Sequence, residues 1–246
     1  MSMTLSFNME YFSINDSLNK KEVGIYPQVE KAVYTCDVED PKFIDRIEFS
    51  KANFDPIVAK AVLKKQAKVS DLVSAGIIGF NLKLLISDKL KDILHNSRKS
   101  GLQFFRSPII YENAEIENYW ILNFYEIDMA FIDYANSDIF LTEYVFNHVQ
   151  KLEIGSYDEY LLKKQEIQEK GYPYGIRIER ISLIEDISQD FFALLDVMGG
   201  VKYVVSERLK SEIEIAGCTG IEFMPIELTL NEWLQGGKRE KIYGKA

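Results

Sequence analysis

The chain has 246 residues, of which 47% are hydrophobic and 27% are charged, a composition that excludes disordered and collagen-like proteins. This length suits one large domain or two closely packed lobes. The chain has 29 Lys and Arg residues and 38 Asp and Glu residues, and the resulting formal charge of −9 repels the phosphate backbones of nucleic acids. We therefore expect no nucleic-acid partner.

The two cysteines, Cys36 and Cys218, are too few for a disulfide scaffold and lack the close spacing of a zinc site. The first thirty residues mix charged and apolar side chains, which is not typical of a signal peptide. The densest apolar stretches, 77–80 and 191–195, are far shorter than the roughly 20 residues that span a bilayer. We expect a cytoplasmic protein without a membrane partner.

The first third of the chain predicts short strands over 33–36, 46–49 and 57–63, separated by two Asp-Pro pairs. Ser70 then precedes a short apolar run that ends at Gly76, which indicates a brief capped helix.

Aromatic residues concentrate over 111–134 and predict two strands of a central sheet. Ser156 and Glu159 have the spacing of a capping box, with Gly171 and Pro173 downstream, so 157–170 is the clearest predicted helix. A strand with one solvated face should follow over 176–183.

An internal repeat with a constant offset of 119 residues relates Leu82–Phe104 to Val201–Phe223. The pair Asp88-Lys89 becomes Glu207-Arg208, which keeps the order of charges. The identical positions are Lys83, Ser87, Leu90, Lys91, Gly101 and Phe104, which recur as Lys202, Ser206, Leu209, Lys210, Gly220 and Phe223.

Each copy of the repeat predicts a β-α-β unit. A short apolar strand leads to a capping serine, an acidic residue occupies the first helical turn, and a glycine ends the connection to the next strand. We expect one α+β domain over 1–246, with mixed or antiparallel sheets and short flanking helices. Its two packed lobes, roughly 1–145 and 146–246, would contain the repeat units 82–104 and 201–223.

The sequence contains no recognisable catalytic motif. His95 and His148 lie at no known catalytic spacing from a Cys, Ser or Glu, and the serine-hydrolase, phosphate-loop and dinucleotide motifs are absent. We therefore expect a protein that is not an enzyme, with no catalytic residue and no cofactor.

Four carboxylates form the one alternative site: Glu126, Asp128, Asp133 and Asp138. Oxygen ligands of this type bind calcium or magnesium, so the chain could be a carboxylate-based metal-binding protein or enzyme. The segment lacks the glycine and the regular spacing of a calcium loop, which favours a charged strand edge or turn instead.

The tail from Gly236 is the one basic stretch, and we expect a loosely held, solvated terminus there. The aromatic residues around Trp120 should pack in the core, because the acidic balance disfavours stacking on nucleic-acid bases.

Several stretches carry a resemblance to a known family: 63–75, 84–90, 204–210 and 219–223, with the aromatic strand 119–123 and the acidic stretch after it at the expected place. Taken together, they resemble immunity protein family eleven of bacterial polymorphic toxin systems. The resemblance covers roughly 57–228, includes both copies of the repeat, and consists of residues that build the fold.

This resemblance implies a cytoplasmic bacterial protein that binds a cognate toxin domain and blocks it. It places no functional residue on this sequence, so neither the partner-binding surface nor the oligomeric state is predicted. The acidic surface agrees with it, since negative charge speeds the capture of a basic partner.

Overall fold

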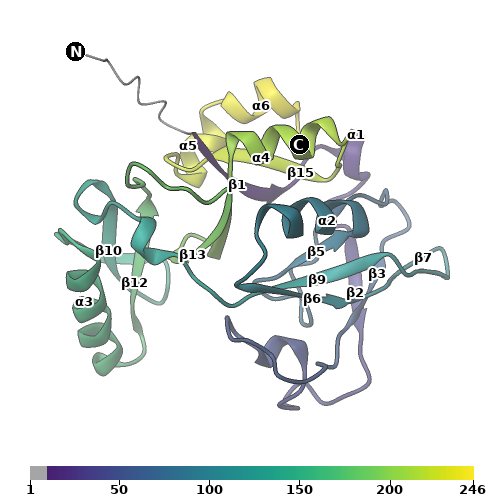
Figure 1. Ribbon diagram of the computed structural model, residues 1–246, viewed down its shortest axis with the longest axis horizontal. Coiled ribbons are helices and arrows are strands. Elements are labelled where there is room, and N and C mark those ends of the chain that lie inside the picture. Colours follow the sequence, from purple (N-terminus) through teal and green to yellow (C-terminus); the bar gives the residue numbers. More distant parts are fainter. Residues whose placement is uncertain (1–9) are drawn as a thin grey trace.

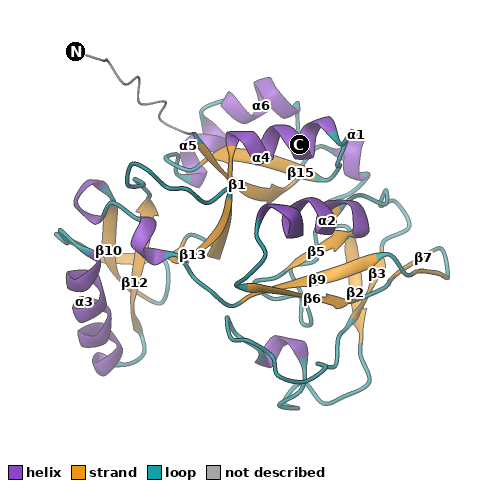
Figure 2. Cartoon of the chain, in the orientation of Figure 1, coloured by secondary structure: helices purple, strands orange, loops and turns teal. Residues whose placement is uncertain are grey.

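Three β-sheets and short helices build the α+β fold seen over residues 10–246 of a computed structural model (Figures 1 and 2). Residues 1–9, part of the expected first lobe, lie outside the described residues. The strands are β1 (Tyr11–Asp16), β2 (Val29–Val33), β3 (Lys60–Leu63), β4 (Leu72–Val73), β5 (Leu84–Ser87), β6 (Leu102–Arg106), β7 (Ile109–Tyr111), β8 (Ala114–Ile116), β9 (Tyr119–Phe124), β10 (Asp138–Glu143), β11 (Asn147–Leu152), β12 (Tyr174–Arg180), β13 (Phe191–Val197), β14 (Gly200–Ser206) and β15 (Ile221–Pro225). The α-helices are α1 (Lys20–Val23), α2 (Asp88–Ser97), α3 (Tyr157–Lys170), α4 (Glu207–Ile215), α5 (Leu230–Gln235) and α6 (Lys238–Tyr243), and the 3-10 helices are η1 (Ile44–Arg46), η2 (Met129–Phe131) and η3 (Tyr134–Asn136).

The described sheets are mixed and mainly antiparallel, which confirms the predicted fold class. The seven-stranded sheet has the order β11-β10-β12-β13-β14-β1-β15. The two four-stranded sheets have the orders β2-β3-β7-β8 and β4-β5-β9-β6. Parallel pairing joins β12 to β13 and β3 to β7.

The β-α-β repeat is confirmed, and both copies have the same local hydrogen bonds. Ser87 Oγ accepts from Leu90 N at 3.3 Å, and Ser206 Oγ accepts from Leu209 N at 3.2 Å, so each serine caps its helix. Gly101 and Gly220 both have a φ of 82°, a conformation that favours glycine before the second strand.

The same offset extends upstream of the predicted repeat, to a pair of aspartates. Ser87 Oγ donates to Asp71 at 2.6 Å, and Ser206 Oγ donates to Asp190 at 2.5 Å. The strand after each aspartate, β4 or β13, then pairs antiparallel with β5 or β14. Each copy is therefore a β-β-α-β unit.

The central strand of each unit comes from a different part of the chain. In unit A (β4, β5, α2, β6 and β9), β9 lies between β5 and β6. In unit B (β13, β14, α4, β15 and β1), the N-terminal β1 takes that place, between β14 and β15. Figure 1 shows β1 beside β15. The registers agree: Tyr119 lies opposite Ser87, and Tyr11 lies opposite Ser206.

The two units pack against each other around one core, to which equivalent residues contribute. Leu90 and Leu94 of α2 and Leu209 and Ile213 of α4 all belong to this cluster. The burial of these apolar side chains is the main force that holds the units together.

Hydrogen bonds also cross between the units in both directions. Leu72 N and Arg98 Nη1 of unit A donate to Thr219 O at 3.0 Å and to Phe191 O at 3.1 Å. In the other direction, the hydroxyl of Tyr203 in unit B donates to Leu82 O at 2.7 Å.

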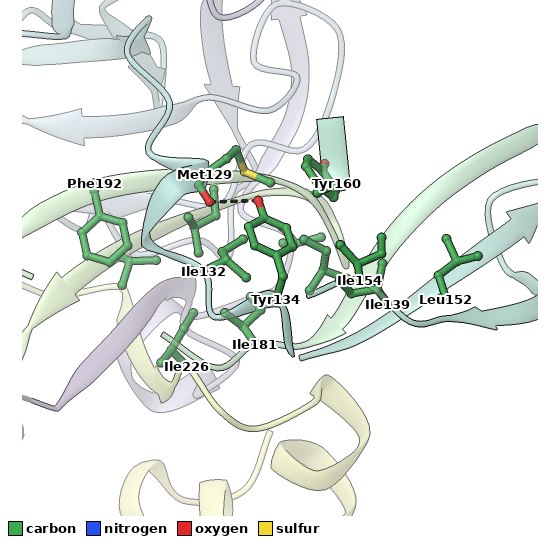
Figure 3. Packing of buried hydrophobic residues seen from close by; sticks show 14 of the residues in the cluster. Met129, Ile132, Tyr134, Ile139, Leu152, Ile154, Tyr160, Ile181, Phe192 and Ile226 are labelled. Atoms are coloured by element: carbon green, nitrogen blue, oxygen red, sulfur yellow. Dashed lines mark hydrogen bonds between the residues drawn. The ribbon is translucent and has the colours of Figure 1, made fainter. Parts of the chain in front are cut away.

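A third part, the hairpin lobe (β10, β11, α3 and β12), continues the sheet of unit B. Its core includes Tyr134, whose hydroxyl donates to Met129 O at 2.9 Å (Figure 3). Phe192 of β13 joins this core, whereas its neighbour Phe191 joins the core shared with unit A. Because neighbouring strand residues point to opposite faces, both faces of β13 are covered.

The hydrogen bonds of Ser70 show why the brief helix predicted there is wrong. Its hydroxyl donates to Leu72 O at 2.6 Å and accepts from Gln28 Nε2 at 2.9 Å, so it does not cap a helix. Leu72 and Val73 instead form β4, which pairs with β5.

In the first third, the strand predicted over 33–36 lies earlier, as β2. The strand predicted over 46–49 is wrong, because residue 46 ends the 3-10 helix η1 and residues 47–49 form no strand. The prediction over 57–63 is right for its second half, β3. Of the two strands predicted over 111–134, β9 is the long one, and the 3-10 helices η2 and η3 occupy the end of that range.

Helix α3 begins and ends as predicted, but its cap differs from a capping box. Ser156 Oγ accepts from Glu159 N, whereas the Glu159 carboxylate accepts from Gly155 N at 2.6 Å and not from Ser156 N. The strand predicted after it is β12.

The expected boundary between two halves near residue 145 is not where the sheets divide. Residue 145 lies in the turn that joins β10 to β11, and β1 belongs to the sheet of unit B. The cause is long-range strand pairing, which leaves no local signal in the sequence.

The basic tail is not a loosely held terminus, because it forms α6, which directly follows α5. Arg239 is 2% exposed and binds Glu222 through Nε at 2.7 Å and Nη2 at 2.6 Å. Trp233 is also buried. No helix within 10–246 is both long and apolar enough to cross a membrane.

Candidate interaction surface

The structure separates the four carboxylates of the alternative metal site into different contacts. Arg98 binds Asp128 at 2.8 Å and Glu126 at 3.2 Å. Asp133 caps η3, and Asp138 binds Lys151 at 2.7 Å. Within 10–246, no group of three or more His, Cys, Asp or Glu side chains is placed to hold a metal ion.

Arg98 is the centre of a buried polar cluster that joins unit A to β13 and the segment before it. Its Nη1 also donates to Gln189 at 2.5 Å, and its guanidinium lies 4.8 Å from the ring centre of Phe124. Burial raises the pKa of Asp128, and the ion pair with Arg98 acts in the opposite direction. These contacts give Asp128 a structural role.

The two histidines are both exposed. His148 Nε2 lies 2.7 Å from Glu179, and its ring stacks on Phe140 with 4.2 Å between ring centres. His95 contacts the ring of Phe104 edge-on. These are surface contacts of the kind that stabilise strands and helices.

A cleft of about 770 Å³ lies where the 181–187 segment passes the ends of β1 and β15. Its lining includes four carboxylates, from Glu10, Glu185, Asp186 and Glu227. The hydroxyl of Tyr11 donates to Ile187 O at 2.9 Å and closes one wall.

The turn between β10 and β11 presents three apolar side chains to solvent: Tyr144, Val145 and Phe146. Phe146 is 73% exposed and Val145 is 58% exposed. Tyr172, on the neighbouring turn, is 85% exposed. We call these four residues the aromatic tip. Contiguous exposed apolar side chains of this kind mark interaction sites in folded proteins.

The backbone of the aromatic tip is strained. Phe146 N donates to Tyr144 O at 2.8 Å, and Val145 between them has a φ of 69°. This is a γ-turn of the rare form with positive φ, at a β-branched residue that strongly disfavours it. Such strain concentrates at functional sites, where the surrounding structure maintains it.

Contacts behind the tip hold its side chains in place. The rings of Tyr144 and Tyr172 meet edge-on with 5.7 Å between centres, and Tyr144 N donates to Pro173 O at 3.0 Å. The ring of Phe146 lies over the buried Arg177, 5.0 Å from its guanidinium carbon. Aromatic anchors that are ordered before binding lose little entropy when a partner covers them.

The aromatic tip was not predicted from the sequence, although its turn carries a signal. A hairpin turn normally contains Gly, Asn or Asp, and Tyr144-Val145-Phe146 contains none of them. Three apolar residues in a row otherwise indicate a buried strand.

Comparison with known proteins does not assign the surface: no protein-family model matches the sequence, and no curated protein is significantly similar to it.

Proposed function

We propose that this chain is a cytoplasmic bacterial immunity protein, a binder and not an enzyme, that neutralises a cognate toxin domain by stoichiometric binding. The observation that carries the proposal is the exposed and strained aromatic tip. The resemblance to immunity protein family eleven supplies the class of partner.

The tip has the features of an interface anchor. Binding energy in protein interfaces is concentrated in a few side chains, most often Trp, Tyr and Arg, at the centre of the contact. Two tyrosines and a phenylalanine project here from adjacent turns that are braced by Arg177 and Pro173. If a toxin domain accepts these side chains in an apolar pocket, the rest of the hairpin lobe covers the surface around that pocket. The active site of the toxin is blocked when it lies within the covered surface.

The test is coexpression with the C-terminal domain of each large secreted protein that is encoded beside this chain. We expect growth rescue and a copurified one-to-one complex with one of them. Phe146→Ser should abolish rescue, since loss of an anchor weakens binding by at least about thirtyfold. The matched control is Ile215→Ser, because Ile215 is 88% exposed on α4, outside the hairpin lobe.

Two results would contradict the proposal. The first is continued killing by every coexpressed toxin domain although this chain is soluble and folded, which would show that none of these domains is its partner. Full rescue by both Phe146→Ser and Tyr172→Ser would show that the aromatic tip is not the anchor.

A further inference from the structure

Arg177 of β12 is a buried cation without a counter-ion, directly behind the aromatic tip. It is 6% exposed, and its one side-chain hydrogen bond within 10–246 runs from Nη1 to the sulfur of Met198 at 3.9 Å. None of the ion pairs within this range includes Arg177, and residues 1–9 contain no Asp or Glu. Because sulfur is a weak acceptor, the chain itself does not neutralise this charge.

The carboxylate nearest to Arg177 along its own strand is already engaged. Glu179 lies two residues further along β12 and therefore faces the same side of the sheet. His148 Nε2 lies 2.7 Å from this carboxylate, and the histidine ring stacks on Phe140, the residue of β10 opposite Arg177. Glu179 thus has its own partner and is not the counter-ion of Arg177.

The carboxylate that directly precedes the tip, Glu143, lies on the other face of the sheet. It alternates with Leu141, which packs in the core of the lobe. Both strand neighbours of Arg177 pack in that same core, so Arg177 itself points to the opposite face. Glu143 is therefore not placed to pair with Arg177, and the charge that a partner meets beside Phe146 is positive.

The free nitrogens of Arg177 reach solvent beside the tip. Within 10–246, Asp45 Oδ1 is the only buried nitrogen or oxygen atom of a side chain that has no hydrogen-bond partner. The nitrogens of Arg177 that lack a partner are therefore hydrated. The ring of Phe146 lies over the guanidinium, 5.0 Å from its carbon, so a partner that packs on this ring also covers those nitrogens.

Covering Arg177 without an acceptor would oppose binding. A cation that loses its water and gains no hydrogen bond raises the free energy of the complex, whereas a carboxylate restores hydrogen bonds and cancels the charge. The planar guanidinium binds a carboxylate through two parallel N–H donors, and arginine is common among the residues that dominate protein interfaces. The partner of the aromatic tip should therefore carry an acid at this place.

We infer that Arg177 is the anion site of the aromatic tip and pairs with an Asp or Glu side chain that a protein partner presents among apolar residues. The inference rests on the proposed function only for taking the partner to be a protein, and adds the chemistry of the segment that docks. An anionic membrane surface suits the tip less well, because it would repel the chain's charge of −9.

The test uses a phage library of random peptides as the probe, so it does not require the toxin. The library is panned on the full-length wild-type chain and depleted on Arg177→Met. We expect the remaining peptides to contain an Asp or Glu among apolar residues and to bind Arg177→Met about ten- to a hundredfold more weakly. Replacing that Asp by Asn, or that Glu by Gln, in the peptide should cause a similar loss on wild type and a much smaller one on Arg177→Met.

Two variants are matched controls. Arg106→Met removes another arginine that lies over an aromatic ring, with its guanidinium carbon 5.4 Å from the ring centre of Trp120, but it belongs to unit A and pairs with Glu117. Lys170→Met removes an exposed charge two residues before Tyr172. Both variants should bind the peptides within about threefold of wild type.

Thermal unfolding separates a binding role of Arg177 from a bracing role. A buried charge without a counter-ion contributes little to stability, so Arg177→Met should leave the midpoint of unfolding unchanged or raise it. Arg177→Lys keeps the charge without the planar fork and should bind the peptides with intermediate affinity.

The inference is overturned if no peptide depends on Arg177, or if the dependent peptides lack a carboxylate. It is also overturned if Arg177→Met lowers the midpoint of unfolding as far as a core truncation such as Leu122→Ala, because Arg177 is then a brace for Phe146. Binding of wild type, but not of Arg177→Met, to vesicles that contain phosphatidylserine would identify a lipid headgroup as the anion instead. Failure of toxin rescue alone would contradict the proposed function and leave the peptide result in force.

Discussion

Units A and B contain the same arrangement of strands and helix, but they obtain their central strand differently. In unit A, β9 follows β6 along the chain after the β7–β8 hairpin, whereas in unit B the same position is filled by β1, from the other end of the chain. Tyr119 and Asn123 of β9 are matched by Tyr11 and Asn15 of β1. Residue pattern and register, and not chain order, therefore determine which strand fills this place.

The units also differ in how they satisfy one polar position, which is half-buried in unit A and buried in unit B. Gln103 of unit A accepts from Ala52 N at 2.9 Å and donates to Ala52 O at 2.9 Å. The equivalent residue of unit B is Glu222, which is buried and bound by Arg239 of α6. A neutral amide in one unit therefore corresponds to an ion pair in the other.

Breaking this ion pair should change the stability of the protein most. Arg239→Met should lower the free energy of unfolding by about 3–5 kcal/mol, because it leaves Glu222 charged, buried and without its cation. Urea denaturation of the variant and of wild type at neutral pH measures the difference.

The double variant Glu222→Gln with Arg239→Met imitates unit A and is the control. It should recover much of the lost stability, since replacing both partners of a buried pair is often tolerated. If the double variant is as unstable as Arg239→Met, the loss arises from packing around α6 and not from the charge.

The equivalence of β1 and β9 predicts matched losses from their cores. Ile14→Ala and Leu122→Ala truncate equivalent buried side chains and should each cost about 2–5 kcal/mol. Denaturant unfolding would show one cooperative transition for each variant. A negligible loss for Ile14→Ala would mean that β1 contributes little to unit B.

Lys202 should be a source of instability that depends on pH. It is 8% exposed, and burial lowers its pKa to about 8. Between pH 8 and 10.5 the unfolded chain binds the additional proton, so this group makes stability rise with pH. Lys202→Met should add about 1–3 kcal/mol at pH 7, and the gain should shrink towards pH 10.5 in urea unfolding.

Lys83 of unit A is the matched control for Lys202. Burial also lowers its pKa, but its Nζ donates to Ile47 O at 3.0 Å. Lys83→Met therefore loses a hydrogen bond and should not stabilise the protein. Equal stabilisation by both variants would contradict this distinction between the units.

The two helix caps should contribute least. Ser87→Ala and Ser206→Ala should each cost about 1 kcal/mol, and their double variant should cost about the sum because the caps are independent. Thermal unfolding at matched pH measures this. An effect confined to one unit would show that only one serine acts as a cap.

Local signals predicted the parts of the fold that depend on local chemistry. The serine caps, the glycines at 101 and 220 and the helix 157–170 all have a sequence pattern that acts within a few residues. The helix expected after Ser70 failed because tertiary contacts to Gln28 and β5 outweighed the capping pattern.

The remaining parts depend on contacts between distant residues. Nothing near β1 indicates that it pairs with β14 and β15, and the charge run around Arg239 does not reveal that Glu222 binds it in the core. The aromatic tip was missed for the opposite reason: its apolar run is typical of a buried strand, and only the fold leaves it exposed.

The distant origin of β1 matters during synthesis on the ribosome. Unit A is complete once β9 has emerged, but β1 waits for its partners β14 and β15, about 200 residues later. At about 5–20 residues per second, this strand spends tens of seconds or less without its neighbours. During that interval its unpaired edges are open to chaperones and to other nascent chains, so the speed of translation bears on how much protein folds correctly.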